Sequence, residues 1–348
     1  MSERPAPRRE RPTIHDVARK AGVSPTTVSH TFSGNGTVAP ATRERVRRAA
    51  SALGYRPDVL ARSLRSNRLG VIALVLRTLE GGPPEGIDYV LQFAGAAAVS
   101  AMQLGYGLML VADPTAPGAP ATAMACDGFV VTEPVEDDPL MDVLHNDGIP
   151  YVAVGRVPGR DVIPALDIFT EPITKRVLDR LHAGGARRIA LVAGTAPNAW
   201  NIDTETSYEK WVRRHRQPIS ISRQPESGQI VGGRTAVDEL FDRDNPPDAL
   251  YCMTGDHAAG ALERLLELGL TVPDDVQILC GSDATHVRAT EPQITAIDLQ
   301  PELLAQLAVT RLVNQLDGTD HPEPEEEATG RLVERASTRP ARRARKRY

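Results

Sequence analysis

The sequence has few cysteines, few aromatic residues and no long hydrophobic segment. Its three cysteines, Cys126, Cys252 and Cys280, are far apart in the chain and fit neither a zinc spacing nor a disulfide framework. We therefore expect a reducing compartment, the cytoplasm. The longest dense apolar run, LGVIALVL at 69–76, is far too short to span a bilayer and is typical of a buried strand. The first ten residues, MSERPAPRRE, lack the apolar core of a secretory signal.

The motifs that mark common enzyme classes are also missing. The sequence has no phosphate-cradling glycine loop, no nucleophile elbow and no metal-ligand spacing. The pair Gly81–Gly82 lacks the strand–turn–helix context that such a loop needs. We therefore expect no enzymatic activity, no cofactor and no bound metal.

Charge is distributed unevenly along the chain. Residues 1–70 hold 14 lysines and arginines against 5 aspartates and glutamates, a net of +9, whereas the remaining residues carry 26 against 40, a net of −14. A basic first fifth on an acidic body indicates a polyanion-binding head on a globular module. The alternative, a disordered basic arm, suits residues 1–11, and residues 339–348 are interpreted as a basic disordered tail.

The basic head is patterned as short helices. Thr13 with Asp16 predicts a helix start, Gly22 predicts its end, and Ser24 with Pro25 predicts the start of a second helix that runs to about residue 32. Two short helices joined by a tight glycine-containing turn are the geometry of a helix-turn-helix, although a surface helix of a small bundle has a similar pattern. The apolar positions expected to face inward are Ile14, Val17, Ala18, Ala21, Val28 and Phe32.

A third helix and a short basic segment follow. The third helix is predicted from the stripe Val46, Ala49, Ala50 and Leu53, with Gly54 as its end. In the segment RPDVLARSLRSNR, leucines one turn apart alternate with arginines. A helix this short is marginal in water by itself, so it needs a partner copy or DNA to order it. The alternative is a linker helix packed on a domain.

These motifs together resemble the LacI/GalR family of bacterial transcription regulators. TIHDVARKAGVSPTTVSHTFSG, VAPATRERVRRAASALGYRP and ARSLRS occur in the order of that family's head and hinge. GALERLLELGLTVPDDVQILCGSD, ITAIDLQ and LVERAST extend the likeness over about residues 12–338. The resemblance implies a homodimer that binds double-stranded DNA at a near-palindromic operator, in the cytoplasm and in association with the nucleoid.

The resemblance also implies which residues contact DNA. Bases would be read by the second helix, and paired hinge helices would enter the minor groove and wedge leucines between base pairs. The DNA-contacting residues implied are Thr13, Pro25, Thr26, Thr27, Ser29, His30, Ala61, Leu64 and Arg65. The family usually has arginine where His30 stands, so a bidentate guanine contact is missing there and the half-site should differ at that base pair. Ala39 replaces the usual capping serine before the third helix.

From residue 69 onward the pattern is that of an α/β body. Apolar strand-like runs alternate with helix-like segments in two series, which indicates two parallel lobes. The expected fold is therefore multi-domain: an all-α helix-turn-helix head (12–57), a hinge helix (58–68) and a two-lobed sensor like type I periplasmic binding proteins (69–338). We place the N-lobe at about 69–166 and 298–325 and the C-lobe at about 167–297 and 326–338, with crossings near Gly159–Asp167, Asp298 and Glu325.

A cleft between the lobes is the expected effector site. Candidate contacts are Tyr89, Arg156, Trp200, Asp256 and Asp283, which include acids that could bind ligand hydroxyls and a tryptophan that could stack on a sugar. The alternatives are a helix cap for either acid, an inter-lobe salt bridge for Arg156, and core packing for Trp200 or Trp211.

The family's usual cleft residues are incomplete in this chain. Thr204 stands near the position of an expected arginine, and GIDY replaces a more aromatic motif. Two interpretations therefore remain: a repressor controlled by a small, carbohydrate-like effector, or an effector-independent regulator with a degenerate cleft.

Overall fold

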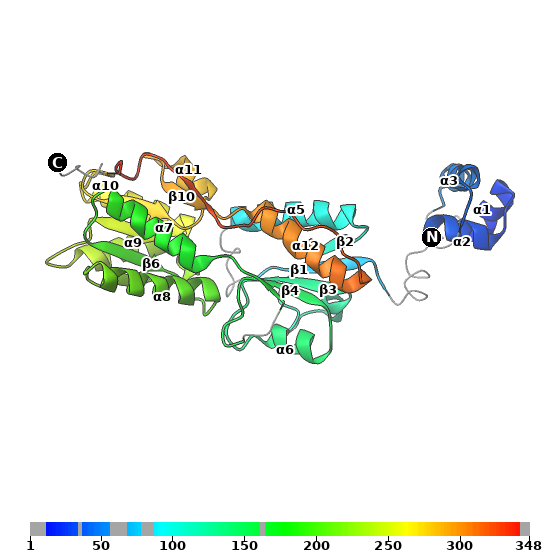
Figure 1. Cartoon of the computed structure of the whole chain (residues 1–348), viewed down its shortest axis with the longest axis horizontal. Coiled ribbons are helices and arrows are strands. Elements are labelled where there is room, and N and C mark those ends of the chain that lie inside the picture. The colour runs from blue at the N-terminus through cyan, green and yellow to red at the C-terminus, as the bar shows by residue number, and fades with distance from the viewer. Residues whose placement is uncertain (1–11, 34–36, 56–67, 78–86, 161–163, 342–348) are drawn as a thin grey trace, which may run out of the picture. The chain divides into compact units, whose positions relative to one another are not determined.

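The computed structural model describes residues 12–33, 37–55, 68–77, 87–160 and 164–341. The chain divides into a head, residues 1–69, and a body, residues 70–348, which are treated separately below (Figure 1). The predicted hinge residues Ala61, Leu64 and Arg65 and most of the two basic termini lie outside the described residues.

The head is a three-helix unit, as predicted. Its helices are α1 (Ile14–Ala21), α2 (Pro25–Ser33) and α3 (Pro40–Leu53). Gly22 and Gly54 end α1 and α3 in the left-handed conformation, both with φ of 64°, which a residue without Cβ adopts at no steric cost. The buried core is the predicted set, with Phe32 and Leu53 packed at its margin: Val17, Ala18, Ala21, Val28, Val46, Ala49 and Ala50.

The first lobe of the body, the N-lobe, is a parallel five-stranded sheet in the order β2-β1-β3-β4-β5. Its strands are β1 (Val71–Val75), β2 (Gly107–Val111), β3 (Gly128–Thr132), β4 (Tyr151–Val154) and β5 (Ala165–Leu166). Helices α5 (Ile87–Gln103) and α12 (Pro301–Asp317) cover one face, and α6 (Pro139–Asn146) covers the other (Figure 1). A short 3₁₀ turn, η1 (Ala121–Met124), precedes β3.

The second lobe, the C-lobe, is a six-stranded sheet in the order β11-β10-β9-β8-β6-β7, parallel except for β11. Its strands are β6 (Ile189–Ala193), β7 (Ile221–Arg223), β8 (Ala249–Cys252), β9 (Gln277–Cys280), β10 (Thr295–Asp298) and β11 (Arg331–Val333). Helices α7 (Thr170–Ala183) and α8 (Ala199–Arg214) pack on one face, and α9 (Gln229–Phe241) and α10 (Gly255–Glu267) on the other. The remaining elements are η2 (Glu226–Gly228) and α11 (Thr285–Ala289).

The chain passes between the lobes three times. It leaves the N-lobe after β5, returns between β10 and α12, and leaves again between α12 and β11. Two of these passages have a non-glycine residue in the left-handed region, Phe169 with φ of 53° and Gln300 with φ of 57°. Backbone in such a conformation stores strain, which is common at hinges and ligand sites.

Helices α9 and α10 cross at unusually short range because glycines lie at the contact. A Cβ on Gly233 would lie 2.1 Å from the carbonyl oxygen of His257, and one on Gly260 would lie 1.9 Å from that of Ile230. Only residues without a side chain allow the two backbones to approach this closely. The crossing holds the start of α10, and hence the cavity wall described below, in place.

Two of the three cysteines are neighbours in space although they are far apart in sequence. Cys252 and Cys280 are register partners on β8 and β9, and both thiols are free and buried. Burial raises the pKa of the Cys280 thiol to about 12. No described helix is long and apolar enough to cross a membrane.

Candidate functional site

The start of each of the first two helices is fixed by polar side chains. The Asp16 carboxylate accepts hydrogen bonds from the backbone N–H of Thr13 (2.9 Å) and from its hydroxyl (2.7 Å), which lowers the pKa of Asp16. The Ser24 hydroxyl accepts the backbone N–H of Thr27 at 3.1 Å and so caps α2, as the sequence predicts. The two helix starts are thereby held in the helix-turn-helix arrangement.

Helix α2 has a buried side and a polar accessible side. Val28 is completely buried, whereas Thr26 is exposed and His30 is partly exposed one turn further along. Pro25, Thr27 and Ser29 are also partly accessible, and Thr13 of α1 is exposed. The described residues predicted to contact DNA are therefore accessible, as a recognition helix requires.

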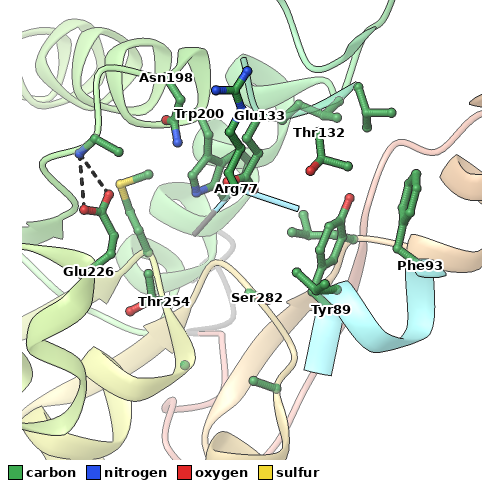
Figure 2. Close-up of a pocket in the computed structure, with 18 of the residues that line it drawn as sticks. Arg77, Tyr89, Phe93, Thr132, Glu133, Asn198, Trp200, Glu226, Thr254 and Ser282 are labelled. Atoms are coloured by element: carbon green, nitrogen blue, oxygen red, sulfur yellow. Dashed lines mark hydrogen bonds between the residues drawn. The ribbon is translucent and has the colours of Figure 1, made fainter. Parts of the chain in front are cut away.

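The body encloses a cavity of about 380 Å³ lined by residues of both lobes (Figure 2). This volume falls within the usual size range of small-molecule sites. The N-lobe wall includes Arg77, Tyr89, Phe93, Thr132, Glu133 and Val135. The C-lobe wall includes Asn198, Trp200, Asn201, Glu226, Met253, Thr254, Asp256, Ser282 and His286.

Three of the five predicted effector contacts lie in this wall: Tyr89, Trp200 and Asp256. Asp256 is not the cap of α10, because Thr254 caps that helix and accepts the backbone N–H of His257. Instead, the Asp256 carboxylate is hydrogen-bonded to the imidazole of His286, another residue of the wall. Trp200 is partly accessible.

The other two predicted contacts lie outside the cavity wall. Arg156 makes a two-pronged ion pair with Asp203 of α8, at 2.6 and 3.2 Å, and so links the lobes. Asp283 pairs with Arg335 at 2.9 Å and is adjacent to two residues of the wall, Ser282 and Ala284. The sequence left open whether Arg156 contacts a ligand or forms a salt bridge between the lobes, and the structure has the salt bridge.

Trp211 packs in the C-lobe core and is 6% exposed. Its indole N–H donates to Asp179 at 2.8 Å, and its ring stacks on His215. Thr204, which stands near the expected arginine position, is fully buried. Neither residue lines the cavity.

Sequence reasoning missed three charged residues of the wall: Arg77, Glu133 and Glu226. Arg77 and Glu133 follow the carboxyl ends of β1 and β3, the edge at which parallel sheets bind ligands. That rule could have found these two residues. Glu226 lies in η2 after β7, and its short, irregular surroundings gave no such signal.

The Glu226 carboxylate is held by groups of the C-lobe itself. It accepts the backbone N–H groups of Thr195 (3.0 Å) and Ala196 (3.1 Å) and the side-chain amide of Asn201 (2.6 Å), partly visible as dashed lines in Figure 2. A Cβ on Gly194 would lie 2.0 Å from this carboxylate, so a side chain there would displace Glu226 from this position. Glu226 is therefore a fixed, fully satisfied negative charge.

Arg77 is engaged by acids of its own lobe. Its guanidinium pairs with Asp113 at 2.7 Å and with the fully buried Asp138. Asp138 also caps α6 by accepting the backbone N–H groups of Leu140 and Met141. Arg77 thus lies in the cavity wall with two carboxylates already bound to it.

Glu133 also faces the cavity, but its pKa is raised above the ordinary value of a glutamate. Its side chain is exposed within the cavity wall, and partial desolvation by the surrounding walls together with the Glu226 charge raises its pKa to about 7. The residue has φ of 47°, a left-handed conformation that is rare for glutamate. Strain of this kind is found preferentially at ligand sites.

Direct contacts join the two lobes beside the cavity. Val135 and Asn198 form an isolated β-bridge, and the backbone N–H of Glu136 donates to the carbonyl of Pro197 at 2.9 Å. With the Arg156–Asp203 pair, these contacts hold the lobes together around the cavity. The described residues contain no cluster of side chains suited to a metal ion.

A head with an accessible recognition helix, attached in sequence to a two-lobed body with an enclosed cavity, defines a class: DNA-binding regulators with a small-molecule sensor. Residues 13–58 match the family described as bacterial regulatory proteins, lacI family, and residues 178–338 match the periplasmic binding protein-like domain.

Similar proteins agree with these matches along nearly the whole chain. The HTH-type transcriptional regulator CelR of Thermobifida fusca is 29% identical over 329 residues, which are 89% of this chain and 94% of that protein. The solved structure of a transcriptional regulator CelR–cellobiose complex is 26% identical, with a TM-score of 0.65, and covers 94% of this chain and 100% of that one. The lac repressor dimer bound to operator shares the fold, with a TM-score of 0.78 at 23% identity, over 95% of this chain and 100% of that one.

The chain therefore contains the DNA-binding region of the lacI family and a periplasmic binding protein-like domain, and it is similar over most of its length to transcriptional regulators of that family. It is therefore a DNA-binding transcriptional regulator rather than an enzyme.

Proposed function

We propose that this protein is a repressor that binds a near-palindromic operator as a homodimer and that a small, carbohydrate-like molecule in the body's cavity controls its operator affinity. The observation that carries this proposal is the combination of a capped recognition helix with an enclosed cavity of about 380 Å³ in one chain. The similar CelR structure contains cellobiose, which makes a sugar the first class to test.

In the head, we assign base contacts to Pro25, Thr26 and His30 and phosphate contacts to Thr13, Thr27 and Ser29. Their accessibility on α1 and α2 supports these roles. The minor-groove wedge is assigned to Leu64, with Ala61 and Arg65 beside it, on the family resemblance alone. In the body, Tyr89, Trp200 and Asp256 are assigned to the effector because they line the cavity, and Arg156 and Asp283 are assigned to holding its surroundings.

The homodimer is supported by an apolar stripe on the N-lobe. Leu91, Val99 and Met102 of α5 are 62, 51 and 70% exposed, and they recur at helical spacing on one face. Leu110, on the adjacent edge strand β2, is 51% exposed. Exposed apolar side chains on neighbouring elements favour an interface, and a second copy of this chain is the partner that a near-palindromic site requires.

Selection of bound fragments from a genomic DNA pool tests the proposal. We expect a near-palindromic consensus bound by a dimer, with affinity that falls steeply as salt rises because the contacts to phosphates release counterions. Failure to enrich any sequence, or binding insensitive to salt, would contradict it. The protein is expected to act in the cytoplasm, on the nucleoid.

The effector half of the proposal has its own test. A sugar that binds the folded protein must raise the protein's melting temperature. A sugar that controls the repressor must also change its operator affinity, and operator DNA must change the sugar affinity by the same factor. A broad metabolite screen that produces neither effect, with operator binding intact, would favour the alternative of an effector-independent regulator with a degenerate cleft.

A further inference from the structure

We propose that the effector carries a positively charged nitrogen group, an ammonium or guanidinium, that pairs with Glu133 inside the cavity. This inference rests on the proposed function, because it names the chemistry of the molecule that the sensor recognises. A purely neutral sugar is the alternative that the experiment below distinguishes.

The first observation is that Glu133 has no partner of opposite charge. Among the described residues, none makes a hydrogen bond or ion pair to its side chain, although the carboxylate lies in the cavity wall. The nearby charge that acts on it is another carboxylate, Glu226. The Glu226 carboxylate repels the charged form of Glu133, and a cation supplied by the ligand would offset that repulsion.

The second observation is that the arginine in the described part of the cavity wall is already paired with carboxylates. Arg77 is the single arginine or lysine among the described residues of the wall, and Asp113 and Asp138 already bind it. The described acids in or directly behind the wall are Asp113, Asp138, Glu133, Glu226 and Asp256, and Arg77 is the arginine or lysine that opposes them.

The third observation is the aromatic lining on both sides. Tyr89 and Phe93 of α5 lie with ring centroids 6.1 Å apart on the N-lobe side, and Trp200 belongs to the C-lobe side (Figure 2). Aromatic faces attract cations through the ring quadrupole and also pack against sugar or hydrocarbon rings. Aromatic side chains and an unpaired carboxylate in one cavity are the groups that bind an organic cation.

A cation also changes the protonation of Glu133 in a measurable direction. In the free protein, with a pKa of about 7, Glu133 is partly protonated at neutral pH. A bound positive charge favours the carboxylate and lowers that pKa, so binding at pH 7 releases a fraction of a proton. A neutral ligand that encloses Glu133 further has the opposite effect and takes up protons.

The experiment compares cations with matched neutral analogues. The purified full-length protein is screened by thermal shift against guanidinium, quaternary ammonium and amino-sugar compounds, each paired with a compound carrying a hydroxyl group instead, such as D-glucosamine with D-glucose. We expect at least one cation to bind ten or more times more tightly than its neutral partner. Titration calorimetry at pH 7 in two buffers, with a guanidinium or quaternary compound, should show proton release.

Variants identify Glu133 as the responsible group. Glu133→Gln should weaken the cation at least tenfold and abolish proton release, whereas the control Glu136→Gln, an exposed acid three residues on and outside the wall, should do neither. Asp and Asn tolerate a left-handed backbone better than Glu does. Glu133→Asp and Glu133→Asn are therefore a second charged and neutral pair, which separates loss of charge from loss of folding.

The possible failures point to different conclusions. If neutral sugars bind and no cation binds more tightly than its neutral partner, or if Glu133→Gln binds the cation as tightly as the wild type, the inference is overturned and the sugar-regulated repressor stands. If no compound of either kind binds, the inference is rejected together with the effector half of the proposed function. Failure to select any operator sequence, by contrast, overturns the proposed function without bearing on the ligand's charge.

Discussion

His30 offers the most direct test of how the head reads DNA. It is a partly exposed residue one turn beyond Thr26 on α2, at a position where the family resemblance implies arginine. Imidazole can make one hydrogen bond to a purine, whereas arginine makes a two-pronged contact to guanine worth about 1–3 kcal/mol. We therefore predict that His30→Arg changes one base pair of each selected half-site to one containing guanine and leaves the other positions unchanged.

The control for this substitution is His15→Arg, at an exposed position of α1. It adds the same guanidinium outside the recognition helix, so it should strengthen binding to all sequences without changing the consensus. An unchanged consensus for His30→Arg would show that this residue does not face a base.

Glu133 predicts how the stability of the body depends on pH. Its pKa is about 7 in the folded protein, above its ordinary value of 4.5. The folded state therefore binds more protons than the unfolded state between these values, and the contribution of Glu133 to stability falls as pH rises from about 4.5 to 7. We predict that Glu133→Gln is progressively more stable than the wild type as pH is raised from 5 to 8.

Urea unfolding of both proteins at several pH values measures this difference. Glu136→Gln, whose carboxyl group is outside the cavity, should show a difference that hardly changes with pH. A Glu133→Gln difference that is equally flat would mean that the carboxyl group titrates normally in the folded protein.

The helices of the head were predictable because each start and stop is local. Ser24, Gly22 and Gly54 act on backbone groups within a few residues, so the sequence alone indicates where α1, α2 and α3 begin or end. The lobes were also predictable as alternating strands and helices. In contrast, the Arg156–Asp203 pair joins residues 47 positions apart, and its existence depends on how the lobes meet.

The charges of the cavity were the least predictable feature. Arg77 looks like a free cation in sequence, but Asp113 and Asp138 approach it only when β1, the chain after β2 and the start of α6 come together. Glu133 is equally inconspicuous, because its lack of a partner is a property of the assembled walls. Local patterns do not report long-range pairing, so the candidate site needed the structure.

The crossing of α9 and α10 gives a prediction about packing. A side chain at Gly233 would meet the backbone of His257 at 2.1 Å and that of Ala261 at 2.8 Å, and backbone cannot move aside as a flexible side chain can. Gly233→Ala should therefore lower the free energy of unfolding by about 1–3 kcal/mol. Thr235→Ala, an exposed substitution on the same helix, should stay within about 0.5 kcal/mol of the wild type.

Urea denaturation followed by circular dichroism measures both changes. A Gly233→Ala protein as stable as Thr235→Ala would mean that the helices separate without cost, and the short crossing would then have no structural importance.

The apolar stripe on α5 gives a prediction about assembly. Met102, the last residue of the stripe, is 70% exposed. If the stripe is the homodimer interface, a carboxylate at this position would be buried without a partner. We predict that Met102→Glu weakens dimerisation at least tenfold, as measured by sedimentation equilibrium. Operator binding should weaken in parallel, because in a dimer the binding of one head raises the effective concentration of the second head at the other half-site, and a monomer lacks this effect.

Ile219→Glu is the matched control, because Ile219 is 46% exposed in the C-lobe, away from α5. It should leave the dimer intact. If Met102→Glu also remains fully dimeric, the copies associate through a different surface.

The second passage between the lobes has a consequence for synthesis on the ribosome. Helix α12 supplies Leu304, Leu312 and Val313 to the N-lobe core, yet it is translated after nearly all of the C-lobe. The nascent N-lobe therefore emerges with one face of its sheet covered by α5 alone and waits for about 130 further residues, β6 to β10 among them, before its core is complete. Premature termination before residue 301 would thus release two unfinished lobes rather than one finished lobe and one missing lobe.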